Sequence, residues 1–353
     1  MTSITTQYNP NHELNARLVA AGGSKTVYAL VTPETEAVKD SLFNERAEYF
    51  EMFRDAWTTK QDAYHREFFD LWHEWSKPVV DLDRGVFPHF YPTNGASEAL
   101  RHLIYDFASK CTRGDNPLIH VFEGEYEGYK AMAEAAGVAV MEWARGDWRA
   151  LVDRLNAGNC GWSHLVFISQ PSAIDGMVWG DFNEFVRSIK MPNSVVVDLT
   201  YVGAVPEDAI GERFGMNVPS IKSVVFSLSK PFGVYYDRVG GVFTREEDAG
   251  LYGNIWFKNL TSLRLGSLLL KQFDVFYMPH AYRETQQAAV DKVAHELGIT
   301  LCPADVYILA RGDGISAADA ALVDYLRRPA SGPMRVCLTP AMAKMIGMVG
   351  EKI

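Results

Sequence analysis

The stretch "FSLSKPFGVYYDRVGG" (226–241) joins the end of an apolar strand pattern to two basic side chains. Lys230 closes the strand pattern, and Arg238 follows eight residues later, shortly before two glycines. A lysine that leaves water at the end of a buried strand costs free energy unless a chemical partner meets its amine. The rest of the sequence must therefore supply that partner.

Short apolar runs alternate with helical patterns along most of the chain. The runs that predict strands are residues 117–122, 138–143, 164–169, 194–199, 223–229 and 240–244, and helices are expected to begin near Ser97, Tyr126, Asp147 and Asp181. Near-continuous apolar runs are typical of strands that are buried on both faces. The alternation predicts an α/β fold with an open, mostly parallel sheet flanked by helices.

Polar side chains stand at the carboxyl ends of these predicted strands, where open α/β sheets bind their ligands. "TNGASEAL" (93–100) opens a helix, so the free N–H groups of its first turn can cradle a phosphate. "DLTY" (198–201) places Asp198 at a strand end, with Tyr201 three residues later. Because a buried carboxylate without a partner would become neutral, Asp198 needs a cationic or hydrogen-bonding neighbour.

Each of these stretches has another interpretation when it is taken alone. "TNGASEAL" is also similar to the GxSxG turn of serine hydrolases, although alanine replaces the last glycine and no histidine stands in a triad position. Asp198 could also cap the helix that follows it. Lys230 could also be an exposed lysine that lies beyond the end of a strand. The combination is more specific than any single stretch.

One cofactor requires all of these chemical groups together. Pyridoxal 5′-phosphate needs a lysine amine for its aldehyde, a carboxylate at its ring nitrogen, a phenol near its 3-oxygen and donors for its phosphate. Lys230, Asp198 and Tyr201 are groups of the first three kinds, and Arg238 is a phosphate donor. The sequence therefore predicts pyridoxal 5′-phosphate as cofactor.

The order and spacing of these residues resemble those of the fold-type I pyridoxal-phosphate enzymes, particularly the aspartate aminotransferase superfamily (aminotransferase class I/II). The shared pattern is Asp-x-x-Tyr, then Ser-x-x-Lys about thirty residues later, then Arg eight residues past the lysine. The resemblance implies that Lys230 forms the internal aldimine, that Asp198 pairs with the ring nitrogen and that Tyr201 hydrogen-bonds the ring oxygen. It also implies that the phosphate is held by Gly95, Ala96, Ser97, Ser227 and Arg238.

Two further segments extend the resemblance. In "EGEYEGY" (123–129), Tyr126 matches the family's aromatic residue that stacks on the cofactor ring. In "MRVCLTP" (334–340), Arg335 matches the arginine that binds the α-carboxylate of the substrate. A forked guanidinium suits this task because it donates two parallel hydrogen bonds to a carboxylate.

One segment departs from the family pattern. "QPSAIDG" (170–176) stands where the family has NPxNPTG, so that Ala173 replaces the asparagine that hydrogen-bonds the ring oxygen. Tyr201 must then be the only hydrogen-bond donor to the ring oxygen, unless Gln170 or Ser172 replaces the asparagine.

The resemblance implies a seven-stranded large domain and a smaller α+β domain built from the two chain ends. We expect a helical arm and part of the small domain at 1–75, the cofactor-binding large domain at 76–285 and the C-terminal small domain at 286–353. The expected activity is an aminotransferase that acts on an amino acid and a 2-oxo acid. The alternative is β- or γ-elimination, replacement or cyclisation of an amino acid in specialised biosynthesis, because the same motif residues support all of these reactions. A non-enzymatic binding module is disfavoured by the complete lysine, aspartate and arginine set.

Composition limits the partners and the location. The net charge is −10 and there is no run of Lys or Arg, which argues against a nucleic-acid or anionic membrane partner. There is no run of eighteen apolar residues, and a cytoplasmic protein is predicted. No CxxC or HExxH motif predicts a metal site.

A helical stretch from 33 to 76 carries an apolar stripe that includes Leu42, Tyr49, Phe53 and Trp57. Together with the family resemblance, this stripe predicts a homodimer.

Overall fold

A seven-stranded sheet forms the centre of the larger of two lobes. The computed structural model describes residues 10–44, 47, 50–51, 53–54, 62–111, 116–158, 162–257, 259–313, 319–329 and 332–348. The strands are β2 (His89–Asn94), β3 (Asn116–Phe122), β4 (Ala139–Trp143), β5 (Trp162–Ser169), β6 (Ser194–Asp198), β8 (Ile221–Ser227) and β9 (Val239–Thr244). Their order is β2-β9-β8-β6-β5-β3-β4, and β9 alone runs antiparallel to its neighbours.

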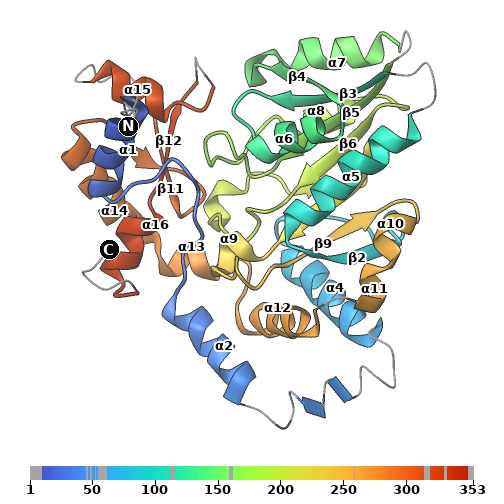
Figure 1. The fold of residues 1–353 in the computed structure, drawn as a ribbon, viewed down its shortest axis with the longest axis horizontal. Helices are drawn as coiled ribbons and strands as arrows, with labels where there is room; N and C mark the ends of the chain where they lie inside the picture. The colour runs from blue at the N-terminus through green and yellow to red at the C-terminus, as the bar shows by residue number, and fades with distance from the viewer. Residues whose placement is uncertain are drawn as a thin grey trace, which may run out of the picture.

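Helices cover both faces of this sheet (Figure 1). They are α4 (Asp62–Ser76), α5 (Ala96–Lys110), α6 (Glu127–Ala135), α7 (Trp148–Asn156), α8 (Phe182–Ser188) and α12 (Leu260–Gln272). On one face Phe226 stacks on Trp72 of α4, with ring centroids 4.2 Å apart. Its neighbour Val225 belongs to the core on the other face, together with Leu100 of α5. Because side chains alternate along a strand, burial of both faces requires the continuous apolar run seen in the sequence.

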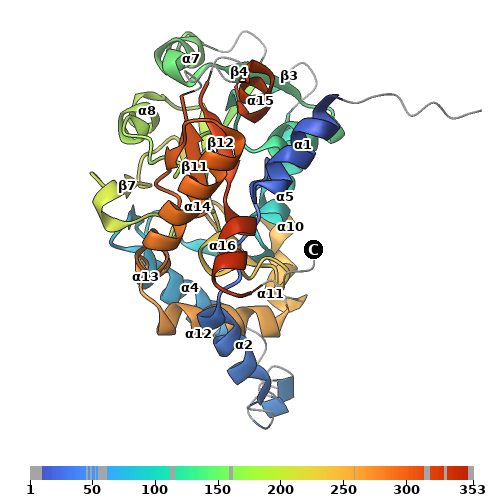
Figure 2. The same ribbon diagram turned by 90° about the vertical axis from the view of Figure 1, so that its left-hand side faces the viewer.

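The smaller lobe is built from both ends of the chain. Its antiparallel sheet has the order β10-β11-β12, and Ser24 adds an isolated β-bridge to Cys337 of β12. The elements are α1 (Pro10–Ala20), α14 (Arg283–Leu297), β10 (Cys302–Pro303), β11 (Leu309–Gly312), α15 (Ala320–Leu326), β12 (Met334–Cys337) and α16 (Thr339–Met345). Figure 1 shows α1 and α16, the first and last described helices, in this lobe, and Figure 2 shows its helices gathered around β11 and β12.

The remaining elements are short or lie between the lobes. They are α2 (Pro33–Asn44), β1 (Val80–Asp81), η1 (Arg145–Asp147), η2 (Glu207–Ala209), β7 (Phe214–Gly215), α9 (Ser229–Phe232), α10 (Ala249–Tyr252), α11 (Asn254–Phe257) and α13 (Tyr277–Ala281). None of the helices in the described part of the chain is long and apolar enough to span a bilayer.

The architecture confirms the predicted fold class. All six predicted strands are present, and the predicted helix starts lie within a residue of the observed ones. The sequence pattern missed β2, because its burial is mixed and Pro92 interrupts it. In the predicted stripe, Leu42 is buried and Phe53 is exposed, whereas Tyr49 and Trp57 lie outside the described residues. The domain boundaries at 75 and 285 stay predictions.

Candidate active site

Lys230 lies on α9, the short helix that directly follows β8. Its Nζ donates a hydrogen bond to the main-chain oxygen of Val27, at 2.6 Å. Gly233 ends α9 with φ 70°, and a Cβ at this position would lie 2.2 Å from the Leu30 oxygen, so only glycine allows this approach of the N-terminal segment. Burial lowers the pKa of Lys230 to about 8. A substantial fraction of its amine is therefore neutral, and thus nucleophilic, at mildly basic pH.

Asp198 ends β6, the strand next to β8, and it is 5% exposed. Its carboxylate accepts hydrogen bonds from the Tyr129 hydroxyl at 3.0 Å and from the Thr200 N–H at 3.0 Å, as well as from the Thr200 hydroxyl. Burial raises its pKa, and the hydrogen bonds from Thr200 and Tyr129 act in the opposite direction. No cationic side chain pairs with it among the described residues. This acceptor is therefore oriented but lacks a positive partner.

Gly95 and Arg238 come together at the start of α5. Gly95 precedes the helix with φ 70°, and a Cβ there would lie 2.7 Å from Arg238 Nη2. Arg238 itself has φ 54°, a left-handed conformation that is strained for an arginine. Its guanidinium donates to the main-chain oxygens of Asn94 at 2.7 Å and Tyr235 at 3.2 Å, so its charge is not consumed by a carboxylate. A helix N-terminus, a glycine and a guanidinium that no carboxylate neutralises among the described residues together have the chemistry of an anion site.

Two further predicted phosphate ligands lie in the first turn of α5, and one lies at the end of β8. Ala96 and Ser97 belong to that first turn, whose N–H groups have no partner within the helix. Ser227 Oγ donates to the Val239 oxygen at 3.1 Å and lies 3.0 Å from Ser229 Oγ, which can donate to it. The two hydroxyls at the end of β8 therefore form a connected pair.

Two of the predicted tyrosines differ in exposure. Tyr126 precedes α6 and is 41% exposed, with its ring edge-on to Tyr129 at a centroid distance of 5.4 Å. Its exposed ring is free to stack on a planar ligand. Tyr201 is 6% exposed, and burial raises its pKa to about 12. Its phenol therefore keeps its proton and can donate a hydrogen bond.

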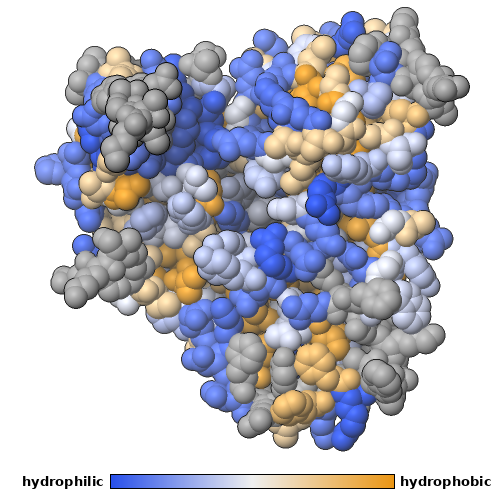
Figure 3. All heavy atoms as spheres, in the orientation of Figure 1, coloured by the Kyte–Doolittle hydropathy of each residue, from blue (hydrophilic) through white to orange (hydrophobic). Residues whose placement is uncertain are grey.

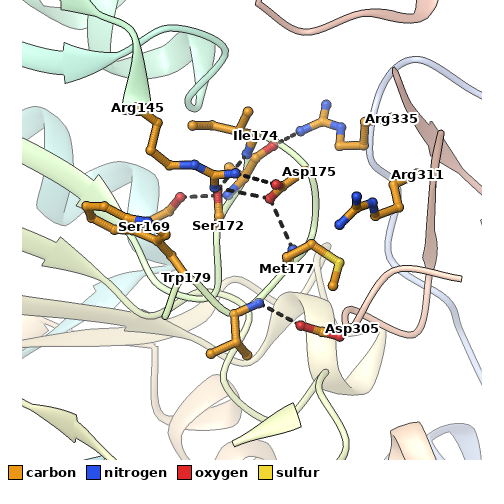
Figure 4. Close-up of polar contacts among 12 residues, drawn as sticks. Arg145, Ser169, Ser172, Ile174, Asp175, Met177, Trp179, Asp305, Arg311 and Arg335 are labelled. Atoms are coloured by element: carbon orange, nitrogen blue, oxygen red, sulfur yellow. Dashed lines mark hydrogen bonds and ion pairs between the residues drawn. The ribbon is translucent and has the colours of Figure 1, made fainter. Parts of the chain in front are cut away.

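Arg335 extends from β12 toward the loop 170–176 (Figure 4) and is 4% exposed. Its Nη1 donates to the main-chain oxygen of Ala173, and its Nη2 lies 3.4 Å from the Lys25 oxygen. Its Nε is buried and has no hydrogen-bond partner among the described residues. An unsatisfied buried N–H is costly, so this guanidinium is suited to a bound carboxylate.

The loop that carries Ala173 is held by its own ion pair. Arg145 pairs with Asp175 and donates to Ser172 Oγ at 3.0 Å. Ser172 is therefore engaged by Arg145, and Gln170 exchanges hydrogen bonds with the main chain of Trp179. Both side chains that were considered as replacements for the missing asparagine have other partners.

The lobes meet at this site, and Figure 3 shows a hollow between them. The amine of Lys230 contacts the N-terminal segment, and Arg335 of the smaller lobe contacts the loop of the larger lobe. The predicted residues thus converge from both lobes.

Sequence reasoning missed four residues that the structure adds to the site. They are Glu125, Tyr129, Thr200 and Ser229. All four lie within the motif stretches: Glu125 and Tyr129 in "EGEYEGY", Thr200 in "DLTY" and Ser229 directly before Lys230. Their roles depend on side-chain direction, which spacing alone does not give.

The donor set fits pyridoxal 5′-phosphate on three observations. Arg238 and the α5 N-terminus form a cradle next to Gly95, where any Cβ would intrude. Asp198 is a buried acceptor without a cation, and Lys230 is an amine of lowered pKa. Together with the sheet order, these features define a fold-type I pyridoxal-phosphate enzyme.

Comparison with known families agrees with this class. The model of the family described as aminotransferase class I and II matches residues 51–294. The chain belongs to this family and is a pyridoxal-phosphate-dependent, aminotransferase-like enzyme. No curated protein sequence matches the chain.

Solved structures share the fold at low sequence identity. YbdL from Escherichia coli, for which a methionine aminotransferase function is described, is 16% identical, with a TM-score of 0.64 and 99% of each chain covered. Histidinol-phosphate aminotransferase from Sinorhizobium meliloti is 14% identical, with a TM-score of 0.58 over 99% of this chain and 100% of that one. A C-S lyase from Staphylococcus hominis is 14% identical, with a TM-score of 0.58 and 80% of each chain covered.

Proposed function

We propose that the chain is an aminotransferase in which Lys230 binds the cofactor and moves the substrate α-proton. The observation that carries this proposal is the position of Lys230 on α9, directly after β8, whose neighbouring strand β6 ends in Asp198; burial also lowers the pKa of this amine to about 8. When bound, pyridoxal 5′-phosphate supplies an aldehyde that condenses with amines and a ring that accepts electrons from Cα. Lys230 is both nucleophilic enough to bond this aldehyde and basic enough to take a proton.

The other side chains orient the cofactor ring and bind its phosphate. Asp198 keeps a proton on the ring nitrogen, and its own orientation is fixed by Tyr129 and Thr200. Tyr201 would donate to the ring oxygen, and Tyr126 would cover one ring face. The phosphate is bound by Gly95, Ala96, Ser97, Ser227 and Arg238.

Arg335 binds the substrate α-carboxylate. Its buried Nε lacks a partner, and the Ala173 oxygen occupies only one of its terminal nitrogens. The substrate amino group then lies near Lys230, because both side chains face the junction of the lobes. The co-substrate is a 2-oxo acid.

A non-transaminating reaction on an amino acid is the second candidate. It is favoured by Ala173, whose methyl group cannot make the hydrogen bond of the family asparagine. Elimination, replacement or cyclisation would use the same Lys230 proton transfer and differ only in the bond that breaks afterwards.

Product analysis tests the two candidates. The loaded enzyme should be incubated with a panel of amino acids and 2-oxo acids, with Lys230→Ala as the background control. Equal amounts of a new amino acid and a new 2-oxo acid support transamination. Ammonia or a released side-chain fragment without a second amino acid contradicts it and supports the second candidate.

We also propose a cytoplasmic homodimer. Tyr236, two residues before Arg238, is 80% exposed beside the phosphate cradle, which favours a partner surface there. Sedimentation velocity at assay concentration should show a dimer, and an active monomer would contradict this assembly. Fractionation of the source cells tests the location.

A further inference from the structure

Glu125 is a buried carboxyl group that the proposed reaction does not use. It directly precedes Tyr126 and is 6% exposed. Ser169 donates to both of its oxygens, from the main-chain N–H to Oε1 at 3.2 Å and from Oγ to Oε2 at 2.6 Å. Burial raises the pKa of Glu125 to about 7, and the charge of Asp198 adds to this rise. Near neutral pH the group is therefore poised between its two protonation states.

The strand register brings this group close to Asp198. Ser169 ends β5 and is the register partner of Asp198 at the end of β6. Tyr129, whose hydroxyl donates to Asp198, feels the charge of both carboxyl groups. The two buried acids therefore lie close together at the ends of β5 and β6.

The surroundings of Glu125 supply no neutralising side chain. The main-chain N–H of Tyr126 faces it from the residue before α6, Tyr129 from α6, Ser169 from β5 and Asp198 from β6. Arg328 approaches the main chain of Glu125, where its Nη2 donates to the main-chain oxygen at 3.2 Å. Arg328 forms an ion pair with Glu127, whose side chain is exposed, so its charge is already neutralised. Neither buried acid forms an ion pair among the residues that the structure describes.

Two adjacent buried carboxyl groups without a cation cannot both ionise at low cost, so their titrations are coupled. We propose that Glu125 and Asp198 form a coupled carboxyl pair that is only partly ionised at neutral pH in the cofactor-free protein. A positively charged ring nitrogen held by Asp198 would supply the missing cation, and Glu125 would then release its remaining proton to solvent. Glu125 is thus a positioning residue that sets the charge available at Asp198. This inference rests on the proposed contact between Asp198 and the ring nitrogen.

Hydrogen bonds also connect the carboxyl pair to the loop 170–176, the segment that departs from the family pattern. Ser169 Oγ, which donates to Glu125, accepts a hydrogen bond from the Ala173 N–H at 2.7 Å. Ala173 is therefore held at its N–H through Glu125 and at its oxygen by Arg335. Ionisation of Glu125 strengthens the bond from Ser169, because charged acceptors form stronger hydrogen bonds.

Calorimetric titration of pyridoxal 5′-phosphate into the cofactor-free protein tests the inference without any measurement of activity. Repeating the titration at pH 7 in buffers of different ionisation enthalpy gives the number of protons released on binding. Because a group with a pKa of about 7 is half protonated at this pH, wild type should release up to about 0.5 proton more than Glu125→Gln. Glu134→Gln, which changes an exposed carboxyl group on α6, the helix that follows Glu125, is the matched control and should behave like wild type.

Equal proton release by wild type and Glu125→Gln overturns the inference. Ser169→Ala provides a second route if Glu125→Gln fails to fold. It removes a hydrogen bond to the ionised form of Glu125, so the proton release should move to higher pH. An unchanged pH dependence in Ser169→Ala also overturns the inference. Failure of every variant and of wild type to bind the cofactor would instead contradict the proposed function.

Discussion

Replacing Lys230 with methionine should stabilise the cofactor-free protein near neutral pH. Burial lowers the pKa of this lysine from 10.5 to about 8, and Arg335 and Arg238 act in the same direction. At 1.36 kcal/mol per pKa unit, this shift disfavours the protonated amine in the folded state by about 3 kcal/mol. Loss of the hydrogen bond to the Val27 oxygen offsets about 1 kcal/mol of this gain. The expected net increase in the free energy of unfolding at pH 7 is therefore about 2 kcal/mol.

The pH dependence of this difference has a defined sign. Between pH 8 and 10.5 the unfolded chain binds more protons at Lys230 than the folded chain does, so the free energy of unfolding of wild type rises with pH. Below pH 8 both states hold the proton, and the penalty is nearly constant. Lys230→Met lacks this titration, so its advantage over wild type should shrink by about 2 kcal/mol between pH 8 and pH 10.

Urea denaturation of the cofactor-free proteins at pH 7, 8 and 10 measures these quantities. Lys130→Met is the control, because Lys130 lies on the surface of α6 with 50% of its side chain exposed and pairs with Glu142. Its effect should stay within about 0.5 kcal/mol at pH 7. A Lys230→Met protein that is less stable than wild type at pH 7, or a difference that does not change with pH, would refute the reasoning about the buried amine.

Three further predictions concern the loaded enzyme. Borohydride reduction followed by peptide mapping should locate the cofactor on Lys230, and a label on another lysine would contradict the assignment. Asp198→Ala should still bind the cofactor through its phosphate but lose about 10²-fold or more in turnover, with a smaller loss in Asp198→Glu; near-normal turnover by Asp198→Ala would exclude the role at the ring nitrogen. Arg335→Lys should weaken amino-acid binding by about 1.5–3 kcal/mol and leave the cofactor affinity unchanged, whereas Arg238→Lys should do the reverse. Cofactor titration of the apo-proteins, followed by substrate titration, separates these two effects, and loss of cofactor by Arg335→Lys would show that another residue binds the carboxylate.

The strands of the large sheet could be predicted because most of them are buried on both faces. Residues such as Val225 and Phe226 enter different cores, so the run stays apolar without interruption. β2 lies at the sheet edge and has a mixed burial pattern, which is why its sequence did not read as a strand. The polar positions that follow strand ends were predictable for the same reason, since parallel strands end at a common edge.

The parts of the site that could not be predicted depend on register and on contacts between lobes. Glu125 lies next to Asp198 because Ser169 pairs with Asp198 across β5 and β6, a relation that spacing along the chain does not contain. The bond from Arg335 to Ala173 joins residues 162 positions apart. Sequence spacing identified both residues separately but gave no indication that they meet.

The charge distribution of the site explains how an acidic protein can bind an anionic cofactor. The chain has a net charge of −10, so its long-range field does not attract a phosphate or a carboxylate. Lys230, Arg238 and Arg335 nevertheless donate only to main-chain oxygens in the described structure, and none of them pairs with a carboxylate there. Their charges therefore remain available to an anion at short range. Arg335 is 4% exposed, so water and salt screen its charge less than the charges of the partly buried Lys230 and Arg238. Affinity for anions therefore arises at the junction of the lobes itself, and the carboxylate contact of Arg335 should depend less on ionic strength than the phosphate contact of Arg238.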